Sequence, residues 1–276
     1  MTRLLLNTMP KSGTNLIVKL LNRFGMKMSG SLDYRGVVLR REMGRIRSRY
    51  SKLSRKIRKQ FDDRRGYIIG IMNPSEFQRE AIDKLFQITE DGQFIQGHLG
   101  YSDVILNKAL SLKYKLVLTI RNPLAVLRSR FHYIMKQKER NPAYKILKKV
   151  DEETAFDILI EGYSGEECSF PSLQACYNAI QPWLREEVHI VKFESIIGPK
   201  GGGSKQIQQE VIQSLVKYLN IDISKEKLSR IVSNLYGGTR TFDKGKIDSW
   251  RDELTNAQIQ KVRMDIEPFM KQFGYF

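Results

Sequence analysis

A lysine, a glycine and several hydroxyl and amide side chains follow the first apolar run of the sequence. The run Leu4–Thr8 leads into Met-Pro-Lys-Ser-Gly-Thr-Asn, and a helical pattern begins near Thr14. Gly13 would let backbone N–H groups approach an anion closely, and the helix N-terminus would direct its amides and positive dipole end at the same point. Lys11 adds a mobile positive charge. This stretch therefore predicts an anion-binding loop after a buried strand.

The loop is not a Walker A motif. That motif requires Gly-x-x-x-x-Gly-Lys-Ser/Thr, whereas here Lys11 precedes Gly13 and no glycine lies upstream in the loop. The sequence therefore disfavours an ordinary enzyme that uses ATP or GTP.

A second segment, Thr119–Tyr133, has the same order of strand, polar turn and helix. Arg121 lies at the strand end, Pro123 suits the first helical turn, and Ser129 follows about two turns later. A guanidinium fork beside a hydroxyl group is suited to binding a phosphate. The segment therefore predicts a second phosphate contact at the same edge of the sheet.

Together the two segments resemble the nucleotide-binding motifs of sulfotransferases that use 3′-phosphoadenosine-5′-phosphosulfate (PAPS). PKSGTNL is similar to the family's 5′-phosphosulfate-binding loop, and RNPLAVLRSRFHY is similar to its 3′-phosphate-binding segment. The resemblance implies sulfuryl transfer from PAPS to a hydroxyl group, with PAP, the desulfated cofactor, as product and no metal ion. It assigns cofactor binding to Lys11, Ser12, Gly13, Thr14, Asn15, Leu16, Arg121, Ser129, Lys244 and Gly245.

The resemblance also implies catalytic roles. Lys11 would stabilise the charge on the leaving group, and Arg121 and Ser129 would bind the 3′-phosphate. His98, in FIQGHLGYSD, lies just after a predicted strand and matches a catalytic histidine of the family's cytosolic branch. Gln96 replaces the lysine that the family has in that stretch. The expected mechanism is in-line transfer with His98 as the general base.

Some glycan-directed relatives use a glutamate as the base. Glu76, Glu80 and Asp83, on a helix predicted over 75–87, keep a carboxylate base open as an alternative. His132, within a predicted helix, and His189, within a predicted strand, are interpreted as structural.

TFDKGKIDSW, Thr241 to Trp250, is similar to the family's Lys-Gly loop. Lys244 and Gly245 match, but Asp243 stands where an arginine commonly binds the 3′-phosphate. Arg240 or Lys246 could compensate. Adenine is expected to stack on an aromatic or apolar side chain of the last third, such as Phe242, whereas Trp183 and Trp250 are expected in the core.

The 276 residues carry a formal net charge of +17. The segment Arg35–Arg65 holds thirteen Lys or Arg and three acidic residues, with apolar residues at spacings of three and four. This pattern predicts a basic amphipathic helix. Its basic face would be solvated or would contact an acidic acceptor, an anionic membrane surface or a nucleic acid.

Short apolar strands alternate with helical patterns along the chain, which predicts an α/β fold. The architecture expected is three layers, with a central, mainly parallel sheet flanked by helices, like that of P-loop NTPases. One domain over 1–276 is expected, with helical insertions at about 30–71 and 138–169 that select the acceptor. The predicted strands are Leu4–Thr8, Gln93–Gln96, Leu116–Ile120 and Val188–Phe193. The predicted helices are 14–23, 75–87, 123–137, 172–184, 205–219, 225–236 and 256–273.

The cysteine and histidine counts and the lengths of the apolar runs bear on where in the cell the protein is expected. Two cysteines and three histidines make a disulfide framework or a zinc site improbable, and no apolar run approaches the roughly 20 residues that span a bilayer. We therefore expect a cytoplasmic protein. The Gly-rich stretch Gly198–Lys205 is interpreted as a mobile loop.

Two alternatives to a sulfotransferase remain at this stage. One is an ATP-dependent kinase with a P-loop-like fold, and the other is a basic module that binds nucleic acid or a membrane surface through Arg35–Arg65. The acceptor, whether glycan, lipid or small metabolite, and the oligomeric state are not predicted.

Overall fold

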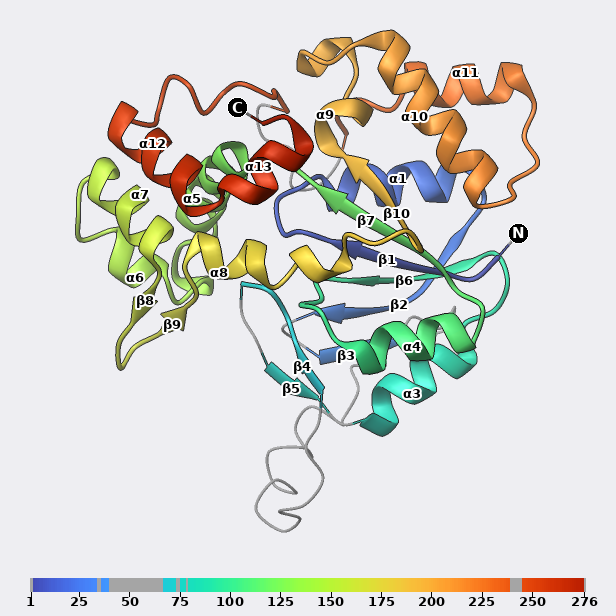
Figure 1. Ribbon diagram of the computed structural model, residues 1–276, viewed down its shortest axis with the longest axis horizontal. Coiled ribbons are helices and arrows are strands. Elements are labelled where there is room, and N and C mark those ends of the chain that lie inside the picture. Colours follow the sequence, from blue (N-terminus) through green and yellow to red (C-terminus); the bar gives the residue numbers. More distant parts are fainter. Residues whose placement is uncertain are drawn as a thin grey trace.

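The computed structural model describes residues 2–33, 36–39, 67–72, 75–77, 79–238 and 245–275. Its centre is a six-stranded sheet with the order β10-β7-β1-β6-β2-β3 (Figure 1). All neighbouring strands are parallel except β2 and β3. The strands are β1 (Leu4–Thr8), β2 (Lys27–Asp33), β3 (Gly36–Leu39), β6 (Gln93–Gly97), β7 (Lys115–Ile120) and β10 (Val188–Lys192).

Continuous apolar sequence in the central strands follows from burial on both sides. Every residue of β1 is buried, as are Leu116 through Ile120 of β7. Leu4 pairs with Phe94 of β6 and with Lys115 of β7, so β1 is the middle of the sheet. A strand with two covered faces shows no alternation of polar and apolar residues, and this explains the run Leu-Leu-Leu.

Helices cover both faces of the sheet and form its two cores (Figure 1). One core uses α1 (Thr14–Arg23), α9 (Phe193–Ile196), α10 (Lys205–Tyr218) and α11 (Lys225–Ser233). The other uses α3 (Arg79–Ile88), α4 (Asp103–Ser111), α5 (Pro123–Gln137), α6 (Tyr144–Leu147), α7 (Glu152–Glu161), α8 (Leu173–Asn178), α12 (Asn256–Asp265) and α13 (Glu267–Phe273). The predicted three-layer α/β fold is confirmed.

Small elements complete the fold. Two-stranded sheets form from β4 (Tyr67–Ile69) with β5 (Ser75–Phe77) and from β8 (Tyr163–Ser164) with β9 (Ser169–Phe170). The 3-10 helices are η1 (Lys138–Arg140), η2 (Gln181–Trp183) and η3 (Pro199–Gly201). The predicted insertion 138–169 thus contains η1, α6, α7 and β8, and Figure 1 places it beside the carboxyl ends of the strands.

Three predicted helices change type or divide in the structure, and the helix predicted over 225–236 ends earlier, at Ser233. The segment predicted as helix 75–87 begins as strand β5, so Glu76 is in a strand and only α3 is helical. Helix 256–273 divides into α12 and α13, because Pro268 lies at the start of α13 and has no N–H to continue the preceding turn. Pro182 ends α8 in the same way and starts η2.

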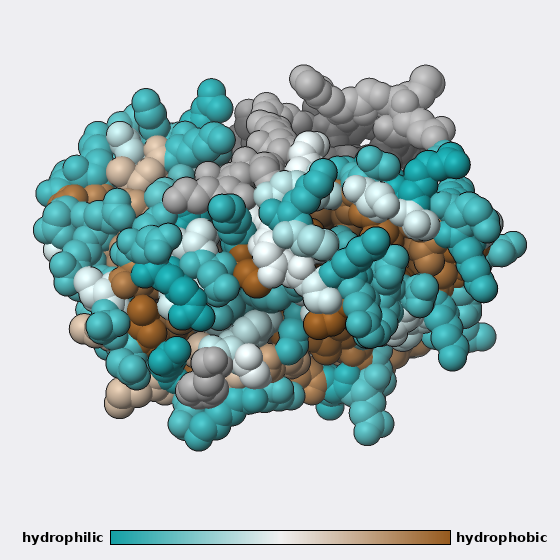
Figure 2. Space-filling model, turned by 90° about the horizontal axis from the view of Figure 1, so that it is seen from above, coloured by the Kyte–Doolittle hydropathy of each residue, from teal (hydrophilic) through white to brown (hydrophobic). Residues whose placement is uncertain are grey.

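The predicted basic helix within Arg35–Arg65 lies almost wholly outside the described residues. In the described part of the chain, no helix is long and apolar enough to cross a bilayer. Figure 2 shows that hydrophilic side chains dominate the face seen from above, with apolar side chains in small groups between them.

Candidate active site

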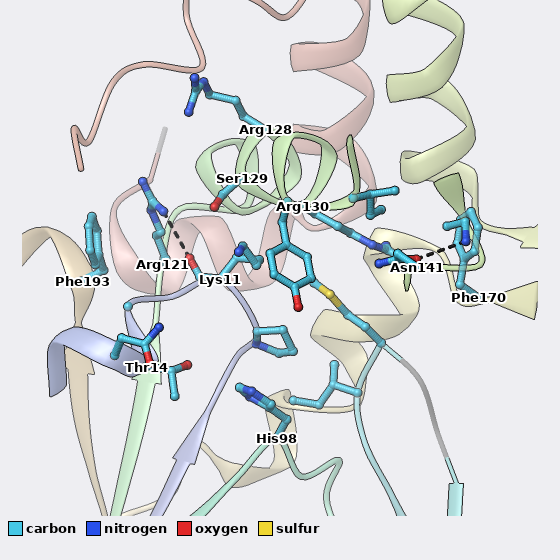
Figure 3. Close-up of a pocket in the computed structure, with 18 of the residues that line it drawn as sticks. Lys11, Thr14, His98, Arg121, Arg128, Ser129, Arg130, Asn141, Phe170 and Phe193 are labelled. Carbon is cyan, nitrogen blue, oxygen red and sulfur yellow. Dashed lines mark hydrogen bonds between the residues drawn. The ribbon is translucent and has the colours of Figure 1, made fainter. Parts of the chain in front are cut away.

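A cavity of about 610 Å³ lies at the carboxyl ends of β1, β6 and β7. Figure 3 shows its two sides, with Lys11 and His98 between them. We call one the loop side, formed by Gly13, Thr14, Arg121, Ser129, Phe193 and Lys246. We call the other the insertion side, formed by Ile71, Arg130, Asn141, Ala143, Cys168 and Phe170.

The loop after β1 has a conformation that only glycine fits. Gly13 has φ of +88°, and a Cβ atom there would lie 2.5 Å from Cδ2 of Phe193. Lys11 also has a positive φ, 71°, which is uncommon for a residue with a side chain. The first turn of α1 begins beside the cavity, and in it the N–H of Leu16 donates to the carbonyl oxygen of Gly13, at 2.8 Å. Gly13, Thr14, Asn15 and Leu16 all line the cavity.

Ser12, by contrast, does not line the cavity. Its side chain is fully buried, and Oγ donates to the carbonyl oxygen of Met9 or of Thr119. Oγ also lies 3.0 Å from the hydroxyl oxygen of Thr119. The structure thus places this hydroxyl group where it holds the loop against β7.

Lys11 extends into the cavity from the same loop. Its Nζ lies 4.0 Å from the ring centroid of Tyr133 on α5, a cation–π distance. Its carbonyl oxygen accepts a hydrogen bond of 3.1 Å from Nη1 of Arg121. Tyr133 therefore contacts the ammonium group at the boundary between the two sides, and Arg121 holds the backbone of Lys11.

Arg121 is the buried centre of the loop side. It is 8% exposed, and its guanidinium carbon lies 4.1 Å from the ring centroid of Phe193. Nη2 donates to the carbonyl oxygen of Lys246, at 3.2 Å. Burial lowers the pKa of the guanidinium, and the charge of Glu194 opposes that effect. Among described residues Nε has no hydrogen-bond partner, so one buried donor remains for a ligand.

Glu194, which follows β10, orients the start of α5. One carboxylate oxygen accepts from the N–H of Asn122, at 2.9 Å, and the other accepts from the hydroxyl group of Tyr275, at 3.0 Å. Ser129 lies two turns further along α5 and lines the cavity. The structure therefore brings Arg121 and Ser129 to one side, as the sequence predicted.

The Gly-rich stretch Gly198–Lys205 supports this side by close packing. The N–H of Ile247 donates to the carbonyl oxygen of Gly201, at 3.1 Å. A Cβ atom on Gly201 would lie 2.6 Å from the carbonyl oxygen of Gly245. The glycines thus serve to bring two backbones together next to the cavity. Gly245 lines the cavity, whereas Lys244, Asp243, Phe242 and Arg240 lie outside the described residues.

His98 follows β6 and has a defined tautomer. Its Nδ1 lies 2.8 Å from the carbonyl oxygen of Thr8 and 2.9 Å from the hydroxyl oxygen of the same residue. A carbonyl oxygen can only accept, so Nδ1 carries a proton, and in the neutral ring Nε2 then carries the lone pair. The imidazole can therefore accept a proton at Nε2 in the cavity.

Asn7, which sequence reasoning missed, positions the His98 turn. Its buried amide accepts from the N–H of Leu99, at 2.8 Å, and donates to the carbonyl oxygen of the same residue, at 3.0 Å. The indole N–H of Trp183 donates to that carbonyl as well, at 3.2 Å. The sequence feature that could have indicated this role is an asparagine within an apolar strand, next to a polar turn.

The other acidic residues and histidines singled out from the sequence lie elsewhere wherever the structure describes their side chains, and the side chain of Glu76 is not among those described. Glu80 is exposed, and Asp83 pairs with Nζ of Lys108 at 2.7 Å; neither lines the cavity. Nε2 of His132 contacts the carboxylate of Glu253, and His189 stacks on Tyr218 at 4.7 Å. Burial lowers the pKa of His189. Trp183 and Trp250 are buried, which confirms that they belong to the core.

The sequence predicted that the insertions select the acceptor, but it did not single out Arg130, Asn141 and Phe170 on the insertion side. Arg130 and Asn141 point to the same part of the cavity in Figure 3, and Phe170 lies beside them. Arg128 lines the cavity as well, but Nε and Nη2 both contact one carboxylate oxygen of Glu253, at 2.8 Å. The sequence signal was three charged or polar residues in succession, Arg128 to Arg130, on one helix. In the part of the chain that is described, no cluster of three His, Cys, Asp or Glu residues could hold a metal ion.

Comparisons with known proteins agree with the fold. The structure of mouse sulfotransferase SULT7A1 complexed with PAP is similar over 98% of this chain and 85% of that one, with 14% sequence identity and a TM-score of 0.60. A retinol dehydratase in complex with androsterone and inactive cofactor PAP is similar over 98% and 80%, with 13% identity and a TM-score of 0.52. Comparison with curated protein sequences finds no significant match. The family model for the sulfotransferase domain matches residues 1–274, so the chain belongs to the sulfotransferase family.

Proposed function

We propose that this sulfotransferase transfers a sulfuryl group from PAPS to a hydroxyl group of its acceptor, with His98 as the general base and Lys11 as the electrophile. The observation that carries the proposal is that a lysine ammonium and a histidine with a basic Nε2 face one cavity from adjacent strand ends. The anion-binding loop lies on one side of this pair, and space for an acceptor lies on the other.

The loop side has the features that a bound PAPS would require. The positive φ of Gly13 and its close packing against Phe193 set the turn, and the first turn of α1 would offer backbone N–H groups to the 5′-phosphosulfate. Arg121 and Ser129 would hold the 3′-phosphate, with the buried Nε of Arg121 as a donor still to be satisfied. Lys246, next to Gly245, adds a positive charge at the same side. When bound, PAPS supplies the sulfuryl group and a phosphate-type leaving group.

His98 and Lys11 would have different roles in sulfuryl transfer. Nε2 of His98 takes the proton from the acceptor hydroxyl group, while Nδ1–H stays bonded to the carbonyl oxygen of Thr8. That bond holds the ring in place and stabilises the imidazolium as it forms. Nζ of Lys11 places a full positive charge where negative charge develops on the leaving oxygen. Tyr133 holds the lysine near this position.

The acceptor would enter from the insertion side and carry a hydroxyl group. The androsterone in the retinol dehydratase structure is itself an alcohol, which supports this class of acceptor. Ile71, Ile134 and Phe170 give the insertion side apolar surface for the body of such a molecule.

Calorimetry with PAP tests the proposed cofactor. We expect PAP to bind, AMP to bind far more weakly, and ATP with Mg²⁺ to match AMP. Ser129→Ala should weaken PAP binding about tenfold, since it removes a hydrogen bond to a charged group. Ser233→Ala, on an exposed part of α11, is the matched control and should leave PAP affinity unchanged.

Equal affinity for PAP and AMP would contradict the proposed 3′-phosphate site. ATP binding strengthened by Mg²⁺ would instead favour a kinase. Binding of nucleic acid that PAP does not affect would favour the basic module.

A further inference from the structure

The insertion side contains a buried cation whose role the transfer mechanism does not explain. Arg130, on α5, is 5% exposed, and its guanidinium carbon lies 4.9 Å from the ring centroid of Phe170. Its side chain lines the cavity and points towards Asn141 (Figure 3). A positive charge is thus held deep beside the place where the acceptor would bind.

The guanidinium of Arg130 has no anionic partner among the residues that the structure describes. Nη1 is buried without a hydrogen-bond partner, and none of the described carboxylates pairs with this arginine. Burial lowers its pKa, and the nearby Cys176 has a pKa of about 11, so that thiol is neutral near pH 7. Arg128 differs, because the carboxylate of Glu253 neutralises it.

An isolated buried charge is strongly unfavourable unless something pairs with it. The cation–π contact with Phe170 offsets only part of this cost. The guanidinium therefore needs an anion that the described part of the protein does not supply, and it borders a cavity that a ligand can enter.

Asn141 provides a second donor at the same place. Its Oδ1 accepts from the N–H of Ala143, at 3.1 Å, so the amide orientation is set and Nδ2 is directed away from that bond. A guanidinium fork and an amide N–H match the oxygens of a carboxylate, sulfate or phosphate group. Glu167 also lines the cavity, but its carboxylate is half exposed and lies 3.8 Å from Nζ of Lys145.

We propose that the acceptor carries an oxyanion group besides its hydroxyl group, and that Arg130 binds this oxyanion. The inference rests on the proposed function, since both concern one cavity. The oxyanion binds on the insertion side, with the hydroxyl group facing His98. Arg130 is then a specificity residue that selects acidic acceptors over neutral ones.

A matched pair of phenols tests this proposal. The probes are 4-hydroxyphenylacetate and its neutral amide, 4-hydroxyphenylacetamide, each titrated into protein saturated with PAP. We expect the acid to bind about tenfold more tightly than the amide, which is the usual size of one charge-assisted contact. Arg130→Gln should remove this preference, and Arg130→Lys should retain part of it. Arg140→Gln, at an exposed arginine in η1, is the control and should keep it.

The outcomes separate the inference from the proposed function. Equal binding of acid and amide, no binding of the acid, or a preference that survives Arg130→Gln would overturn the role of Arg130. PAP binding in the same samples reports on the nucleotide site alone, so its loss would instead count against the proposed function.

A stability measurement covers the case in which Arg130→Gln disturbs folding. Arg130→Met replaces an unpaired buried charge by a shorter, unbranched apolar side chain. We expect its thermal midpoint to equal or exceed that of the wild type while the preference for the acid is lost. A midpoint lower by several degrees would indicate that Arg130 serves the core.

Discussion

The two sides of the cavity differ in how their polar groups are satisfied. On the loop side, Arg121 donates to the carbonyl oxygens of Lys11 and Lys246, and only its Nε lacks a described partner. Ser12, behind this side, bonds to Met9 and Thr119. On the insertion side, Arg130 is as buried as Arg121 but donates no hydrogen bond to a described residue. Both arginines lie against a phenylalanine ring.

This difference is informative about what each side binds. A site whose buried arginine is already held by two backbone carbonyls is rigid before the ligand arrives, which suits a cofactor that every turnover requires. A site with a buried charge left unpaired is less stable without its ligand and gains more when the ligand arrives. We therefore expect the loop side to fix the donor and the insertion side to discriminate between acceptors.

The largest effect is expected at the boundary of the two sides, at His98. His98→Asn should lower the rate of sulfuryl transfer about 10²–10⁴-fold, because no group then accepts the hydroxyl proton at the position of Nε2. Single-turnover formation of PAP measures this rate, and PAP affinity should stay the same. His189→Asn, in β10, is the control. A rate within a few-fold of the wild type would direct the search for a base to another residue.

Lys11→Met should lower the transfer rate about 10²–10³-fold, the usual loss when one group that stabilises developing charge is removed. The affinity for the acceptor should change little, because Lys11 acts on the leaving group. The same single-turnover assay tests this, with Lys149→Met at an exposed position as control. A loss confined to acceptor affinity would place Lys11 on the acceptor side of the reaction instead.

Gly13→Ala tests the rigidity of the loop side. The substitution combines a positive φ with a contact of 2.5 Å to Phe193, so we expect a loss of about 1–3 kcal/mol in unfolding free energy, and weaker PAP binding. Gly274 also has a positive φ, +63°, but open space surrounds the position of its Cβ atom. Gly274→Ala should therefore lower the unfolding free energy less than Gly13→Ala and leave PAP binding unchanged. Thermal unfolding and calorimetry give both values; equal costs would show that the contact with Phe193 is unimportant.

The smallest effect concerns the two cysteines. Burial raises the pKa of Cys176 to about 11, so its reactive thiolate becomes appreciable only as the pH approaches that value. Cys168 is partly exposed and lines the insertion side, although burial raises its pKa too. At pH 8 we expect N-ethylmaleimide to label Cys168 first, and 4-hydroxyphenylacetate to slow that labelling. Peptide mass mapping identifies the site, and faster labelling of Cys176 would contradict this account.

Much of the architecture could be predicted from local patterns. Strands β1, β6, β7 and β10 were predicted to within one residue at each end, because buried parallel strands are short continuous apolar runs. The bounds of α1 and α5 were also predicted, since a glycine and a proline mark their starts. Strand β5 was predicted as helix, and β2 was not predicted, because polar residues interrupt its apolar pattern.

The sequence by itself determined the family, the anion-binding loop and the candidate pair Lys11 and His98, because each depends on residues that are close together in the chain. Only the tertiary structure decided which polar groups are already paired. The Ser12 hydroxyl group bonds to Thr119 of β7, and the amide of Asn7 bonds to Leu99, 92 positions later in the chain. Gly201 packs closely against the backbone of Gly245. The tertiary structure also decided that the charge of Arg130 has no described partner. Whether a polar group is paired depends on contacts between segments far apart in sequence, and periodicity and spacing do not encode those contacts.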